Sequence, residues 1–209
     1  MFKKTVLQTI AFAAGTALLA LPSIARAASP ISRTSYHNDM RKLWEDHITW
    51  TRIYIVTAVA DLPDQAAAAE RLMQNQVDLG NAIKPFYGEA AGEKLTALLK
   101  DHIVIATQLI AAAKAGDHEK QADALSRWGA NADEIAGFLS GANPRHWTVV
   151  EMKAMMHSHL EATTAEVTAR LQKNWPADVA AYDQVHGQIL MMADMISDGI
   201  IHQFPKNFK

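Results

Sequence analysis

The chain of 209 residues contains no cysteine. This absence excludes disulfide bonds, thiolate zinc sites, a cysteine nucleophile and a lipid anchor attached at a cysteine. Basic residues are also few, with 20 Lys and Arg against 22 acidic residues, and they form no cluster. Nucleic acid and anionic membranes are therefore poor candidates as partners, because phosphate binding needs clustered Lys and Arg.

Linear catalytic motifs are missing as well. The chain has no Gly-x-Ser-x-Gly elbow, no phosphate-binding glycine loop and no His-Glu-x-x-His sequence, which argues against hydrolases, nucleotide enzymes and thermolysin-type proteases. A single histidine acting as a general base would leave no such motif, so enzymatic activity stays open as a minor alternative. We expect a binding protein and not an enzyme.

The N-terminus is typical of an exported protein. Lys3 and Lys4 precede an apolar run from Ile10 to Leu21, and Ala25-Arg26-Ala27 follows, which predicts a signal peptide (1–27) cleaved near Ala27 and a periplasmic or secreted location. The apolar run is shorter than the about 20 residues of a membrane span, and we expect no stable insertion of any later segment. Residues 1–27 carry three of the basic residues and no acid, so the remainder has 17 basic and 22 acidic residues and a formal charge of −5.

The pattern after the signal peptide is all-α. Apolar residues recur at helical spacing, no stretch alternates like a strand, and Gly or Pro marks each break. A short linker (28–35) should precede the bundle domain (36–205). Short connections between long helices favour an up-and-down six-helix bundle, and the expected helices are 36–60, 64–84, 90–115, 118–140, 148–172 and 177–203.

An internal repeat divides this bundle into three related helical hairpins. His47 recurs as His102 and His159, 55 and then 57 residues later, and Asn75 recurs as Asn131 after 56 residues. Periods of this size are typical of repeated supersecondary units. The last helix has no clear Asn counterpart, so the third hairpin is the most diverged.

Three segments carry a family resemblance: NQVDLGNAIKPFYG (75–88), NADEIAGFLSGANP (131–144) and MADMISDGIIHQFP (192–205). They are similar to segments of exported bacterial helical-bundle proteins for which no activity is characterised. The resemblance implies a helical exported protein and supplies no catalytic residue. The name glycosyltransferase is used for some of these proteins, but a helical chain lacks the strand-rich fold expected for nucleotide-sugar chemistry.

Four histidines are expected on inward-facing helical stripes, namely His47, His102, His159 and His186. His157 should face solvent, because residues two apart on a helix point roughly 200° away from each other. Buried imidazoles need partners. One interpretation is a structural network in which Asn75 and Asn131 hydrogen-bond the histidines of their own hairpins.

The alternative is a transition-metal site in the bundle core. The four imidazoles could bind copper or zinc, with Met155 or Asp183 completing the ligand set. Asp183 and His186 have the i, i+3 spacing of two ligands on one helix, and Met155 lies one turn before His159. We therefore expect an exported binding protein for a metal ion or small ligand, or else a metal-free envelope module with structural histidines.

Overall fold

The computed structural model describes residues 30–209, which form six α-helices and one short 3-10 turn (Pro205–Asn207). The predicted all-α class is confirmed, and each expected helix is present with small shifts at its ends. The expected signal peptide lies outside the described residues. The helices are α1 (Arg33–Val59), α2 (Gln65–Tyr87), α3 (Glu89–Ala115), α4 (His118–Ala142), α5 (Val149–Leu171) and α6 (Trp175–Gln203).

Capping side chains determine where several helices begin. Ser32, Asp117, Thr148 and Asn174 each accept a hydrogen bond from the backbone N–H three residues later, which satisfies a donor that the first turn leaves free. The cap at Ser32 starts α1 within the segment expected to be a linker. At the other end of a helix, Gly116 has a φ of 69°, a left-handed conformation that ends α3 at little steric cost.

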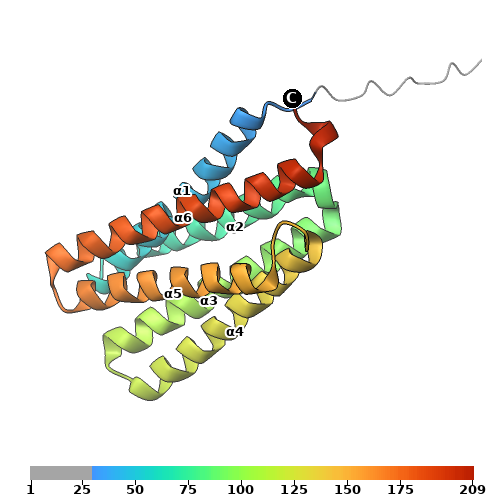
Figure 1. The fold of residues 1–209 in the computed structure, drawn as a ribbon. Helices are drawn as coiled ribbons and strands as arrows, with labels where there is room; N and C mark the ends of the chain where they lie inside the picture. Colours follow the sequence, from blue (N-terminus) through green and yellow to red (C-terminus); the bar gives the residue numbers. More distant parts are fainter. Residues whose placement is uncertain (1–29) are drawn as a thin grey trace, which may run out of the picture.

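The helices form a closed ring in chain order. Each packs against its neighbours in the sequence, and α6 packs against α1. Figure 1 shows that α1, α3 and α5 run in one direction while α2, α4 and α6 return in the other. Helix α1 also contacts α3 and α5, so the three odd-numbered helices meet at the centre of the bundle.

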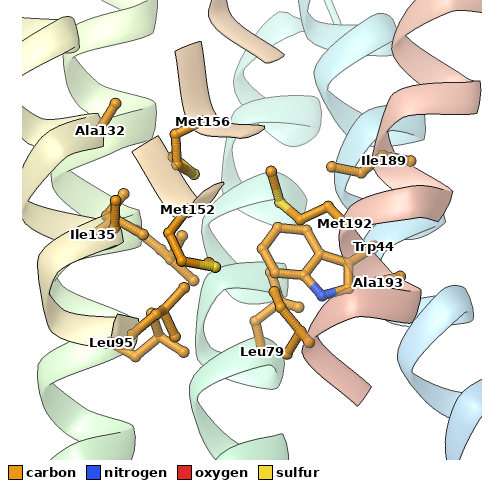
Figure 2. Packing of buried hydrophobic residues seen from close by; sticks show 14 of the residues in the cluster. Trp44, Leu79, Leu95, Ala132, Ile135, Met152, Met156, Ile189, Met192 and Ala193 are labelled. Carbon is orange, nitrogen blue, oxygen red and sulfur yellow. The ribbon is translucent and has the colours of Figure 1, made fainter. Parts of the chain in front are cut away.

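All six helices contribute to the main core. Figure 2 shows Met152, Met156 and Met192 lying close to the Trp44 indole, with Leu79 and Leu95 below them. Met152 is 0% exposed. Methionine adapts to irregular gaps because its side chain is unbranched, and here methionine side chains fill the middle of the core beside Trp44.

Close backbone contacts bring α2 and α3 together. A Cβ added at Gly80 would lie 2.6 Å from the carbonyl oxygen of Gly92, so a side chain there would force the two helices apart. A similar contact joins the α4–α5 loop to α6, where a Cβ at Gly199 would lie 2.0 Å from Nε1 of the buried Trp147. These glycines determine how near the helices can approach.

The two ends of the described chain are tied together. The Ile31 N–H donates to the Asn207 carbonyl oxygen at 2.8 Å, and the Lys209 N–H donates to the Ile31 carbonyl oxygen at 2.9 Å. Phe208 packs against Tyr36 and Phe86 with ring centroids 5.2 and 5.5 Å apart. Both ends of the described residues therefore help to close the bundle at one end.

A buried ion-pair cluster joins α1 to the third hairpin. Arg52 donates to Glu166 at 2.8 Å and also to Asp178, and Arg170 donates to Asp178 at 3.1 Å. The side chains of Glu166 and Asp178 are each only 2% exposed. Each of these charges has an opposite partner, which burial requires.

Helix α3 is long and apolar enough to cross a membrane by length and composition alone, although Lys100 and Asp101 lie near its middle. In the fold its apolar residues line the core between α2 and α4. A core helix of a globular protein and a membrane span can have the same length and composition.

Candidate functional site

Three of the four expected histidines meet inside the bundle. His47 on α1, His102 on α3 and His159 on α5 are 3%, 3% and 4% exposed. The rings of His47 and His159 have centroids 5.9 Å apart, and all three rings border one cavity. They form a histidine layer at one level of the three central helices.

Asn131 holds the second histidine of this layer. Its Oδ1 lies 2.7 Å from Nδ1 of His102, and its Nδ2 donates to the carbonyl oxygen of Leu98 at 3.1 Å. The bond to Leu98 determines which end of the amide faces the ring. Nδ1 of His102 therefore carries the proton, and in the neutral ring Nε2 is a lone-pair acceptor.

Gln188 repeats this arrangement in the third hairpin. Its Oε1 lies 3.1 Å from Nδ1 of His159, and its Nε2 donates to the carbonyl oxygen of Met155 at 3.0 Å. Nε2 of His159 is likewise an acceptor. Gln188 was not predicted, because the repeat of Asn75 and Asn131 pointed to a third Asn and not to a Gln.

The first hairpin uses two amides. Asn75 donates to the carbonyl oxygen of Leu43 at 3.0 Å, and Gln76 lies 3.3 Å from Nδ1 of His47. The separation between histidine and amide is 29 residues in each hairpin: His47 to Gln76, His102 to Asn131 and His159 to Gln188. This constant separation was the signal that could have found Gln76 and Gln188.

Burial keeps the three imidazoles neutral. It lowers the pKa of His47 and of His102 to about 3 and the pKa of His159 to about 4, because a charged ring would lose its hydration. Repulsion from the other histidines lowers the pKa of His47 and His102 further, and the amide contacts oppose the shift. Near neutral pH the layer therefore has no charge.

A cavity opens on one side of the histidine layer. Its volume is about 40 Å³, enough for a water molecule or a small chemical group. The residues four positions after the histidines, namely Thr51, Ala106 and Thr163, form part of its wall. Fifteen residues line the cavity, and none of them is Lys, Arg, Asp or Glu: His47, Thr51, His102, Ile103, Ala106, Leu109, Ile110, Ala113, Gln121, Trp128, His159, Thr163, Thr164, Val167 and Thr168.

Three buried polar atoms at this cavity lack protein partners. Nε2 of His102, Oγ1 of Thr163 and Nε1 of Trp128 have no hydrogen-bond partner among the described residues, and their residues are 3%, 5% and 3% exposed. An unpartnered buried polar group costs about 1–3 kcal/mol. Such groups are commonly satisfied by a bound water or ligand, which is the property expected of a binding site.

His186 does not point inward, contrary to expectation. Its side chain is 45% exposed, and its Nε2 lies 3.1 Å from Oε1 of Glu45 on α1. The inner stripe of α6 passes through Val185 and Ile189 instead, so His186 lies beside that stripe. Asp183 is exposed on the same helix and does not join the histidine layer.

Met155 lies at the edge of the layer and not in the cavity wall. It is half-buried, and its sulfur lies 3.0 Å from Nε2 of Gln188. His157 faces solvent, as predicted, with its side chain 48% exposed and paired with Asp133. Within residues 30–209, no group of three or more His, Asp or Glu side chains is arranged to hold a metal ion.

In comparisons with known proteins, no family model, curated protein or solved structure matches this chain.

Proposed function

We propose that this protein binds a small neutral molecule inside its helical bundle, with the polar group of the ligand on the histidine layer. The supporting observation is the cavity bordered by His47, His102 and His159, where the buried Nε2 of His102 has no protein partner. Binding sites are typically concave and mostly apolar with a few placed polar groups. The cavity has that kind of lining, and its volume of about 40 Å³ accommodates only the polar end of a ligand.

The chemistry of the cavity favours a ligand that donates a hydrogen bond. Nε2 of His102 and of His159 are acceptors, because Nδ1 of each ring faces an amide oxygen. A carboxylate would meet these lone pairs with no cation nearby, and an ammonium group would be buried without a carboxylate. Alcohols and phenols match the acceptors and the apolar wall, and their oxygen can accept a hydrogen bond from the unpartnered Nε1–H of Trp128.

Nitrogen NMR of the imidazoles tests this proposal. Phenol and 1-butanol should shift the Nε2 resonances of His102 and His159, while butanoate should leave them unchanged. His159→Phe should weaken phenol binding at least 10-fold, a loss of about 1.4 kcal/mol. His157→Ala changes an exposed histidine two residues away and should bind phenol like the parent protein. Unmoved imidazole resonances at saturating phenol and 1-butanol would refute the proposal.

A transition metal is the second candidate, supported by the amide contacts at Nδ1. Metal-binding histidines commonly donate their other ring N–H to a fixed acceptor, which orients the ligand nitrogen. His102 and His159 have such contacts. Copper or zinc binding would require the three rings to draw closer together, because their arrangement in the fold does not form a metal site.

Calorimetric titration with zinc or copper distinguishes the two candidates. A core metal site predicts one ion per chain, lost in both His102→Ala and His159→Ala and retained in His157→Ala. Unchanged stoichiometry in both core variants would exclude the metal site and leave the neutral-ligand proposal intact.

We also propose that the three hairpins arose by internal repetition and that the protein is exported. Three histidine–amide pairs with the same 29-residue separation support descent of the three hairpins from one unit. Export would place the cavity in the periplasm or outside the cell, where it would meet ligands from the environment. N-terminal sequencing of the protein from its native host should begin at or near Ala28.

A further inference from the structure

A groove between α4 and α5 lies next to the histidine-lined cavity. Its volume is about 740 Å³. Thr164 and Thr168, one helical turn apart on α5, line both the groove and the cavity. The two spaces therefore share one wall, and α4 and α5 are the least closely packed of the neighbouring helix pairs.

The surface of the groove is mostly apolar, although polar side chains are part of its lining, and it carries no Lys or Arg. Its lining is Leu125, Ser126, Gly129, His157, Leu160, Glu161, Thr164, Ala165, Thr168, Ala169 and Gln172. Leu125 is 45% exposed, which is high for a large apolar side chain. Glu161 is an acid at this surface, so an anionic ligand would be repelled there.

We infer that this groove holds the apolar chain of the ligand, and that the ligand is a long-chain alcohol whose hydroxyl group reaches the histidine layer. This inference rests on the proposed function, since it assigns the head group to the cavity. The inner cavity of about 40 Å³ accommodates only the hydroxyl end. Thr164 and Thr168 border both spaces, so a chain that leaves the cavity past these two side chains enters the groove.

Gly129 allows the groove to be filled without disturbing the core. A Cβ added there would meet only Cε1 of His157, at 4.0 Å. Gly129→Leu therefore adds bulk to the groove, and leucine also favours a helix more than glycine does. Gly137 is an exposed glycine on the same helix with nothing within 4 Å, so Gly137→Leu is the matched control. Ala165→Leu fills the groove from α5 as an independent second variant.

The test compares straight-chain alcohols from 1-butanol to 1-decanol by calorimetry. In the parent protein and in Gly137→Leu, affinity should rise about 4-fold for each added methylene group that the groove buries. In Gly129→Leu and Ala165→Leu, affinity should no longer rise as the chain grows longer than that of 1-butanol.

The outcomes separate the two proposals. If 1-butanol binds but both groove variants keep the chain-length gain of the parent protein, the groove assignment is wrong and the cavity remains the binding site. If the parent protein binds 1-butanol without any gain for longer chains, the groove assignment is again wrong. If the parent protein binds neither phenol nor any alcohol, the proposed function itself fails.

Discussion

The two sides of the histidine layer differ in how they are filled. On one side, Trp44, Met152 and Met156 occupy the centre of the bundle, and the space left among the core side chains there is about 10 Å³. On the other side, Thr51, Ala106 and Thr163 leave a cavity of about 40 Å³. The same three helices pass through both sides.

This difference shows that the cavity arises from side-chain size and not from a change in the backbone. The helices continue unbroken past the histidines, so the space between their axes is available on both sides. Large side chains that precede the histidines in the sequence fill this space on one side of the layer. The short side chains that follow the histidines leave it open on the other side. Packing to high density is the usual state of a protein interior, which makes the open side the exception that needs a function.

The largest expected effect is that of pH on the layer separating the two sides. In the unfolded chain a histidine has a pKa of about 6.5, whereas His47 and His102 have a pKa of about 3 and His159 of about 4 in the fold. Between these values the unfolded chain binds more protons. Stability is therefore complete above pH 6.5 and is lost as the pH falls towards 4. Urea titrations should show a loss of about 5 kcal/mol in unfolding free energy between pH 7 and pH 5.

A matched pair of variants checks the source of this pH dependence. His102→Phe should remove about one third of the slope, because one of three buried imidazoles is lost. His157→Ala should leave the slope unchanged. An equal slope in His102→Phe would mean that other groups dominate the pH dependence.

Truncation on the packed side should cost the next largest amount. Met152 is 0% exposed, so Met152→Ala leaves a void among side chains that cannot fully collapse. We expect the unfolding free energy to fall by about 2–5 kcal/mol, measured by urea denaturation. A cost below 1 kcal/mol would mean that this side repacks freely, and the contrast between the two sides would not hold.

Removing an amide from the layer should cost slightly less. Asn131→Ala leaves Nδ1 of His102 without its partner and removes the bond to the carbonyl oxygen of Leu98, and we expect the unfolding free energy to fall by about 1–3 kcal/mol. Gln188→Ala should have a similar effect in the third hairpin. If water replaces the amide without loss, both variants will unfold at the urea concentration of the parent protein.

The smallest effect is expected on the cavity side. Thr163→Val keeps the shape of the side chain and removes a buried hydroxyl that has no protein partner. We expect unchanged stability or a gain of up to about 1 kcal/mol. A loss larger than 1 kcal/mol would show that a molecule in the cavity bonds this hydroxyl in the free protein.

Sequence patterns were sufficient for the helices and for part of the site. Helical periodicity and the Gly and Pro breaks located six helices, because both signals depend on neighbouring residues alone. The recurrence of His47, His102 and His159 placed the three imidazoles that the fold brings together. Helical periodicity also placed His157 correctly on the outside, since a helix turns by a constant angle per residue.

Other parts of the site could not be deduced in this way. His186 lies next to the inner stripe of α6, and only the packing of α6 against α1 directs it to Glu45 and solvent. Gln188 takes the place of an Asn and contacts both His159 and the carbonyl oxygen of Met155, as Asn131 contacts His102 and Leu98. These outcomes depend on distances of a few ångströms between helices.

The sequence by itself determined the class of the fold, the helical segments and which histidines could face inward, because these properties follow from local propensity and the helical period. Only the tertiary structure decided that three of the histidines share one level, that each has its own amide, and that a cavity adjoins them. Depth along a bundle and the space between helices depend on the lengths of the connections and on contacts such as Gly80 with Gly92, which join residues from different helices.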